Sequence, residues 1–231
     1  MKQMSRKGER KTEIMGKVVI PLKNVKLAGE LTMPAEATGL VLFAHGSGSS
    51  RHSPRNQFVA RKLQRAGIGT FLFDLLTAEE EESEAQTRHL RFNIDLLTER
   101  LVGATRWALD EGTEREVCIG YFGASTGAAA ALKAAAELRD DVLAVVSRGG
   151  RPDLAGDALE RVTAPTLLIV GGDDLQVIAL NESAYDHLPG EKALRIVPGA
   201  SHLFEEPGAL EKVADMAIDW FETRLVPIAR R

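Results

Sequence analysis

The chain has 231 residues, a formal net charge of −4, 44% hydrophobic residues and a single cysteine, Cys118. This length fits one large domain, which buries enough surface to fold without disulfides or metals. A lone cysteine excludes an internal disulfide and favours a reducing compartment, so we expect a cytoplasmic protein. Because charges of both signs are dispersed through the body of the chain, nucleic acid is not an expected partner.

The N-terminus is the one basic segment. Its first dozen residues carry five cations: Lys2, Arg6, Lys7, Arg10 and Lys11. A signal peptide would continue into an apolar stretch, whereas this segment stays polar. Since no apolar run approaches the roughly 20 residues of a membrane span, no membrane partner is expected. We expect residues 1–12 to be a flexible basic tail and residues 13–231 to form one domain.

Short apolar runs alternate with amphipathic stretches along the rest of the chain. The first two, Gly16–Leu22 and Val25–Met33, alternate apolar and polar residues and predict an antiparallel pair at a sheet edge. Six later runs are nearly continuous in Val, Ile, Leu or Phe: Leu40–Ala44, Ile68–Phe73, Val117–Phe122, Val142–Ser147, Thr166–Val170 and Ala193–Val197. Strands buried on both faces have this composition, so we predict an α/β fold with a mainly parallel central sheet and helices on both faces.

Two stretches have clear helical periodicity. The first places apolar residues at three- and four-residue spacing: Leu90, Ile94, Leu97, Leu101, Ala104 and Ala108. The second follows Pro207, a residue typical of a helix start, and runs from Leu210 to Phe221. We expect both apolar faces to pack on the sheet rather than to line a groove for a cofactor or partner. The acidic run Glu79–Glu82 is expected to be a solvated loop near the pocket mouth, too short for a large lid.

A candidate nucleophile follows the third of the buried runs. The sequence Gly-Ala-Ser-Thr-Gly at positions 123–127 lies between a predicted strand and an Ala-rich helix from Ala128 to Leu138. A nucleophile elbow requires this context, because flanking glycines remove side chains that would clash at a sharp strand-to-helix turn. Ser125 would then project above the sheet at the positive end of the following helix. The motif predicts an α/β-hydrolase fold with Ser125 as nucleophile.

A serine nucleophile needs a histidine base, and the chain offers five candidates: His45, His52, His89, His187 and His202. In triads of this fold the histidine comes last in chain order, in a loop after the final strand. His202 alone has that position, just past the run ending at Val197. We expect His187 to lie in a helix, His89 at a charged helix start, and His45 to brace a turn.

An acidic group must hold the imidazole in the correct tautomer. The run Thr166–Val170 is followed by Gly-Gly and then by Asp173 and Asp174. A carboxylate at the end of this strand can reach a histidine one loop later. Either aspartate satisfies the order Ser, Asp, His, and the other could cap the turn.

The glycine-rich turn His45-Gly-Ser-Gly that follows Leu40–Ala44 predicts an oxyanion hole. Such a turn presents backbone N–H groups to a developing oxyanion. We assign the donors to the backbone amides of Ser47 and Thr126. A phosphate-binding loop is the competing interpretation, but no Gly-Lys-Ser/Thr follows and the G-x-G-x-x-G spacing is absent.

Four segments carry a resemblance to a known family. They are residues 42–56 (LFAHGSGSSRHSPRN), 120–130 (GYFGASTGAAA), 147–154 (SRGGRPDL) and 198–206 (PGASHLFEE). The chain resembles bacterial dienelactone hydrolase-like α/β-hydrolases from about residue 14 to residue 225. The resemblance implies a triad of Ser125, Asp174 and His202, which prefers Asp174 over Asp173. The short acidic run at Glu79–Glu82 predicts only a minimal cap.

This chain also departs from the family pattern. Dienelactone hydrolases use a cysteine nucleophile, whereas the elbow here holds a serine, so dienelactone is not assumed as substrate. Cys118 falls inside the preceding strand, where it is expected to be a small core residue. Some relatives are joined to a phosphoribosyltransferase domain, and we expect 231 residues to leave no room for one.

Several arginines fall near the predicted catalytic edge. Arg148 directly follows a strand, and Arg151 lies three residues later. A guanidinium there could bind a substrate carboxylate through two hydrogen bonds. The alternative is a structural ion pair with Asp153, Asp157 or the acidic run Glu79–Glu82.

Together these features predict a serine hydrolase, a carboxylesterase that cleaves small esters or lactones through an acyl-enzyme, with a small-molecule ester as its partner. No metal or organic cofactor is required. Two alternatives stay open: another chemistry on this fold, such as a carbon–carbon hydrolase, lyase or perhydrolase, and a non-catalytic binding module. Composition does not indicate the oligomeric state.

Overall fold

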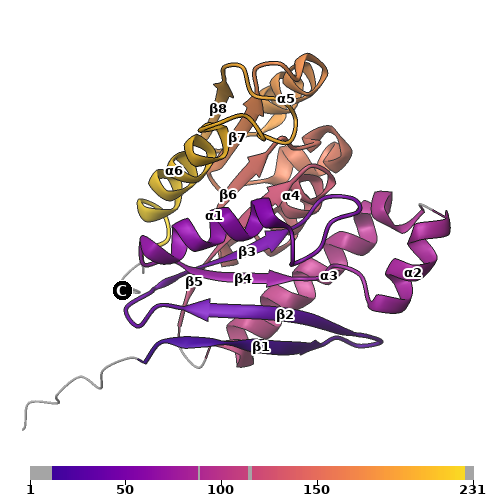
Figure 1. The fold of residues 1–231 in the computed structure, drawn as a ribbon, viewed down its shortest axis with the longest axis vertical. Helices are drawn as coiled ribbons and strands as arrows, with labels where there is room; N and C mark the ends of the chain where they lie inside the picture. Colours follow the sequence, from indigo (N-terminus) through magenta and orange to yellow (C-terminus); the bar gives the residue numbers. More distant parts are fainter. Residues whose placement is uncertain (1–11, 88, 114–115, 227–231) are drawn as a thin grey trace, which may run out of the picture.

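A computed structural model describes residues 12–87, 89–113 and 116–226 of the chain. The basic tail expected at residues 1–12 lies outside this part except for Thr12. The described residues form one eight-stranded sheet in the order β1-β2-β4-β3-β5-β6-β7-β8 (Figure 1). The strands are β1 Ile14–Pro21, β2 Lys26–Met33, β3 Gly39–Ala44, β4 Gly69–Phe73, β5 Cys118–Ala124, β6 Val142–Arg148, β7 Thr166–Gly171 and β8 Lys192–Val197. Each predicted strand is confirmed, with small differences at its ends.

Strand direction follows the predicted pattern. β1 pairs antiparallel with β2, with Ile20 opposite Leu27, and β2 pairs antiparallel with β4. All other neighbouring strands run parallel. Because parallel strands end on the same side, the carboxyl ends of β3 to β8 share one edge of the sheet. The loops that carry the predicted site residues all leave from this edge.

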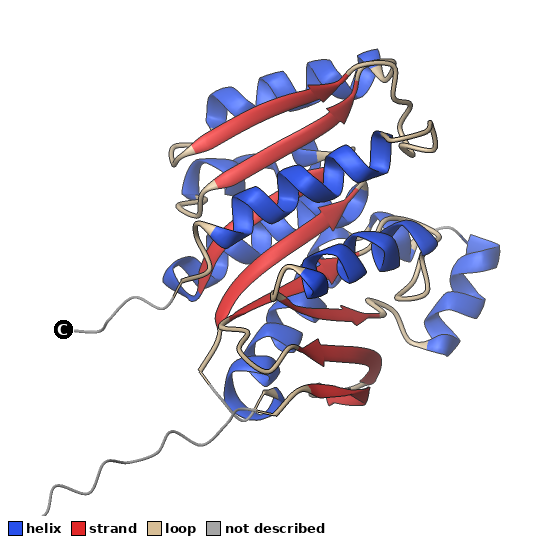
Figure 2. Cartoon of the chain, turned by 60° about the vertical axis from the view of Figure 1, so that its left-hand side comes forward, coloured by secondary structure: helices blue, strands red, loops and turns tan. Residues whose placement is uncertain are grey.

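Helices cover both faces of the sheet (Figure 2). They are α1 Pro54–Arg65, α2 Ala78–Thr87, α3 Ile94–Trp107, α4 Thr126–Leu138, α5 Leu175–His187 and α6 Ala209–Glu222, with short 3₁₀ segments at Leu90–Phe92, Arg139–Asp141 and Pro152–Arg161 and a π-helical turn at Ala108–Gly112. α1 and α6 pack against each other on one face, and α3, α4 and α5 lie on the other.

Both predicted amphipathic helices pack on the sheet. Leu97 and Leu101 of α3 join one buried cluster, and Val213 and Phe221 of α6 join the other. α3 begins later than its apolar stripe because Asn93 caps it: the Asn93 Oδ1 accepts the Leu96 N–H at 3.1 Å. Leu90 therefore precedes the helix.

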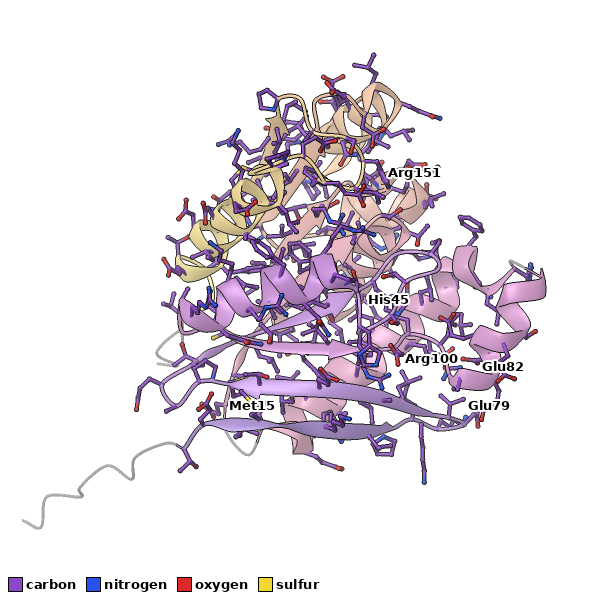
Figure 3. All side chains as sticks on the ribbon, viewed as in Figure 1. Met15, His45, Glu79, Glu82, Arg100 and Arg151 are labelled. Carbon is purple, nitrogen blue, oxygen red and sulfur yellow. The ribbon has the colours of Figure 1, made fainter. Side chains whose placement is uncertain are left out.

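The acidic run Glu79–Glu82 is helical, which corrects the expectation of a loop. Thr77 and Glu80 form a capping box: the Thr77 N–H donates to Glu80 Oε2 at 2.8 Å, and the Glu80 N–H donates to Thr77 Oγ1 at 3.2 Å. Acidic side chains in a first turn also interact favourably with the helix dipole. Glu79 and Glu82 thus lie on α2, at the edge of the molecule (Figure 3).

Candidate active site

Ser125 occupies a strained turn between β5 and α4. Its φ of 51° is in a region that non-glycine residues rarely adopt, at a cost of about 1–3 kcal/mol. A β-carbon at Gly123 would lie 2.5 Å from the Ala128 Cα, and one at Gly127 would lie 2.2 Å from the Ala44 carbonyl oxygen. Both glycines of the motif are therefore sterically required, because the turn packs directly against α4 and β3.

Hydrogen bonds of the main chain hold this turn from two sides. The Ser125 N–H donates to the Arg148 carbonyl at 3.3 Å, and the Ser125 carbonyl accepts the N–H groups of Ala128 at 3.1 Å and Arg151 at 3.0 Å. The serine is thus fixed between α4 and the loop that follows β6. Its side chain, on a partly exposed residue, lies at the carboxyl edge of the sheet.

Asp174 and His202 are in direct contact. The His202 Nδ1 lies 2.6 Å from Asp174 Oδ2, and the side chains are 38% and 16% exposed, respectively. Asp173 is exposed, and its main-chain N–H donates to the Ala200 carbonyl at 3.0 Å. The structure therefore brings Asp174, and not its neighbour Asp173, against the imidazole.

Gly149 lies between the serine turn and the histidine loop. It follows Arg148, whose carbonyl holds Ser125, and has a φ of 52°. A β-carbon there would lie 3.0 Å from the His202 carbonyl oxygen and 3.6 Å from its Cε1. The residue before this glycine thus holds the serine turn, and the glycine itself touches the histidine loop. No hydrogen bond joins their side chains within the described residues, and catalytic hydrogen bonds are often long until substrate binds.

The glycine-rich turn after β3 packs against the serine. A β-carbon at Gly46 would lie 3.0 Å from the Ser125 Cβ. The hydroxyls of Ser47 and Thr126, the two predicted oxyanion residues, are 3.0 Å apart. Thr126 is the first residue of α4, where main-chain N–H groups lack an acceptor inside the helix. The two predicted amide donors are therefore carried by residues that touch each other beside the serine.

His45, labelled in Figure 3, braces this turn through two hydrogen bonds, as the sequence predicts. Its Nε2 accepts the Leu75 N–H at 3.1 Å, so the proton lies on Nδ1, which donates to the Gly46 carbonyl at 3.0 Å. Burial lowers the pKa of the His45 imidazole, which favours this neutral form. His45 therefore ties the glycine-rich turn to the residues that follow β4.

The two candidate substrate-binding arginines lie in different surroundings. The Arg151 Nε and Nη2 donate to the two carboxylate oxygens of Asp153 at 2.9 and 2.8 Å, which is the structural ion pair considered as the alternative. Arg148 is 6% exposed and pairs with no carboxylate among the described residues; its Nη2 lies 3.4 Å from Asn56 Oδ1. Burial, followed by the nearby charge of Arg55, lowers the pKa of Arg148 to about 10.

Sequence reasoning missed two buried residues that support the site. Asn181 on α5 is fully buried and donates to the Gly150 carbonyl at 3.0 Å, which holds the loop after β6. A polar residue on the buried face of a helix could have indicated it. Phe204 is buried with a φ of 58°. No sequence signal marks it, because phenylalanine has no preference for this conformation.

Neither a metal centre nor a membrane span is found in the part of the chain that the structure describes. No three His, Cys, Asp or Glu residues there are grouped so that they could hold a metal ion. No helix there combines the length and apolar character needed to cross a bilayer.

Comparisons with known proteins agree with the fold. A family described as "Alpha/beta hydrolase domain" matches residues 37–225. The crystal structure of a dienelactone hydrolase from Anabaena variabilis is 59% identical, covers 93% of this chain and 99% of its own, and superposes with a TM-score of 0.91. Est1E from Butyrivibrio proteoclasticus is 17% identical, covers 90% of this chain and 98% of its own, and has a TM-score of 0.74, which supports the fold alone.

A Mycobacterium tuberculosis (strain H37Rv) protein that bears the name of a phosphoribosyl transferase is 58% identical over 197 residues. The match covers 85% of this chain but only 44% of that protein, so the chain spans less than half of its length. The name therefore describes a longer protein and is not transferred. From the family match, the identity to the Anabaena structure and the shared fold, this chain belongs to the α/β-hydrolase family and is a dienelactone hydrolase-like member of it.

Proposed function

We propose that the chain is a serine carboxylesterase that cleaves small esters or lactones through an acyl-enzyme intermediate. The observation that carries this proposal is the 2.6 Å contact between Asp174 Oδ2 and His202 Nδ1, at the same edge of the sheet as a serine in a strained strand-to-helix turn. With the Nδ1 proton donated to the carboxylate, the Nε2 lone pair of His202 is available to accept the Ser125 proton.

The first half of the reaction forms the acyl-enzyme. His202 removes the Ser125 hydroxyl proton while Oγ attacks the ester carbonyl, and Asp174 stabilises the imidazolium that results. The main-chain amides of Ser47 and Thr126 stabilise the oxyanion, with the positive end of α4 adding to the field. His202 then gives its proton to the departing alcohol oxygen, and the carbon–oxygen bond of the ester breaks.

The second half releases the acid. Water takes the place of the alcohol, His202 removes its proton, and the resulting hydroxide attacks the acyl carbonyl. The tetrahedral intermediate collapses, and the proton returns to the Ser125 oxygen. The chain's own residues supply every group in this cycle, so the proposed reaction uses no metal or organic cofactor.

Labelling by a fluorophosphonate probe, which reacts with activated serines whatever the natural substrate, tests this function. We expect the wild-type protein to be labelled at Ser125 and to hydrolyse p-nitrophenyl butyrate. Ser125→Ala should abolish labelling and lower kcat by roughly 10⁶-fold, with an unchanged melting temperature. Labelling at another serine, or near-normal activity of the variant, would show that the nucleophile is assigned wrongly.

A further inference from the structure

Arg148 connects three segments of the candidate site. Through its main chain it belongs to β6, lies opposite Ala124 in the sheet and accepts the Ser125 N–H at 3.3 Å. Through its side chain it reaches Asn56 of α1, with Nη2 3.4 Å from Asn56 Oδ1, and Phe204, with its guanidinium carbon 5.8 Å from the ring centroid. One residue thus touches the serine turn, α1 and the loop that carries His202.

The contact with Phe204 bears directly on the histidine. A guanidinium within about 6 Å of an aromatic centroid is attracted by the face of the ring. Phe204 follows His202 by two positions, is 1% exposed and has a φ of 58°. Such a backbone persists only where its surroundings hold it. The Arg148 side chain contacts the Phe204 ring, and the absence of a side chain at Gly149 lets the loop approach closely.

The charge of Arg148 is not balanced by a paired carboxylate among the described residues. Its Nε has no hydrogen-bond partner among the described residues, and its Nη2 reaches only the neutral Asn56. The nearby guanidinium of Arg55 pairs with Glu205 at 3.1 Å, at an exposed position. A buried charge of this kind is costly, and an apolar side chain would fill the same space more cheaply. Packing alone therefore does not explain an arginine here.

We propose that Arg148 is a positioning residue that holds the His202 loop in register with the Ser125 turn, through its cation–π contact with Phe204. This inference rests on the proposed esterase function. It differs from the carboxylate-binding role considered from the sequence, because Arg148 here acts through Phe204 and not on the substrate. Substrate binding is therefore expected to be insensitive to it.

The experiment compares Arg148→Met, Arg148→Lys, Phe204→Leu and the double variant Arg148→Met/Phe204→Leu. The matched control is Arg106→Met, which removes an exposed arginine of α3 whose partner is Glu137. Each protein is assayed for kcat and KM on a neutral ester, p-nitrophenyl butyrate, and on an acidic one, mono-p-nitrophenyl succinate. The fluorophosphonate labelling rate and the melting temperature are measured in parallel.

If Arg148 positions the loop, Arg148→Met should lower kcat and the labelling rate by about 10²-fold, the effect of a displacement of about 1 Å at a reacting group. KM should stay within about twofold on both esters. Arg148→Lys should recover at least about tenfold of the loss, because the cation over the ring is retained. The double variant should be no slower than Arg148→Met, and Arg106→Met should match the wild type.

Three results would overturn the proposal. A rise in KM confined to the acidic ester would assign Arg148 to substrate binding. A lower melting temperature with unchanged kcat would make it purely structural. If the losses in kcat of the two single variants multiply in the double variant, Arg148 does not act through Phe204.

If Arg148→Met does not fold, the test depends on Arg148→Lys and Phe204→Leu. A wild-type kcat in Phe204→Leu then refutes the proposal. Absence of wild-type labelling would instead refute the esterase function.

Discussion

Asp174→Asn is the sharpest test of the proposed triad. In the structure, Asp174 Oδ2 is 2.6 Å from His202 Nδ1 and its side chain is only 16% exposed, so the replacement must face the same ring in nearly the same place. An amide has almost the same size but carries a donor at one of its two positions. When that donor faces Nδ1, the imidazole must move its proton to Nε2, where it can no longer accept the Ser125 proton.

The expected loss follows from this tautomer change. An amide in the orienting position of a triad costs on the order of 10⁴ in kcat, or about 5 kcal/mol of transition-state stabilisation. The assay is kcat on p-nitrophenyl butyrate, together with the second-order rate of fluorophosphonate labelling, which should fall in parallel. Folding should be preserved, because the Asp174 side chain makes no capping hydrogen bond to α5.

Asp173→Asn is the matched control. Its side chain is exposed, and its main-chain bond to Ala200 survives the substitution. We expect kcat within about threefold of the wild-type value. If Asp173→Asn were nearly inactive and Asp174→Asn nearly active, the two roles would be reversed. Wild-type rates in both would remove the acidic member from the mechanism altogether.

Three further predictions follow from the packing and charge of the site. Gly127→Ala places a β-carbon 2.2 Å from a carbonyl oxygen of β3 and should lower the free energy of unfolding in urea by at least about 2 kcal/mol, whereas Gly16→Ala, with no heavy atom within 4 Å, should not. Because burial lowers the pKa of His45 below 6.5, the unfolded chain takes up a proton before the folded one. The free energy of unfolding should therefore keep the whole contribution of His45 above pH 6.5. It should fall as the pH drops below 6.5, by up to about 1.4 kcal/mol per pH unit from this group. A His45→Gln variant with the same pH dependence of unfolding would contradict this. Arg151→Gln should change KM equally little on acidic and neutral esters, since its guanidinium binds Asp153; a rise in KM on acidic esters alone would restore its substrate-binding role.

Much of this fold could be predicted because the signals are local. Continuous apolar runs identify strands buried on both faces wherever they pair, and each predicted strand is present. Gly123 is required by atoms of α4 that any strand–turn–helix of this sharpness would bring close. The helix over Glu79–Glu82 also has a local signal in the sequence, since Thr77 and Glu80 form a capping box.

Other features depended on which distant segments pack together. Asp173 and Asp174 are adjacent and chemically identical, and only the packing of the β7 loop against the histidine loop brings Asp174 to His202. The sequence supplied the residue types, but a change of one position reverses the direction of a side chain.

Arg148 and Arg151 also separate what the chain order determines from what the tertiary structure determines. Their proximity to the carboxyl edge of the sheet follows from their place at and just after the end of β6, and this could be read from the sequence alone. The burial of Arg148 against Phe204 could not be read in this way, whereas Asp153, two positions from Arg151, was already a candidate ion-pair partner. Contacts between residues more than fifty positions apart depend on how α1, β6 and the last loop assemble, and no local pattern of residues encodes that distance.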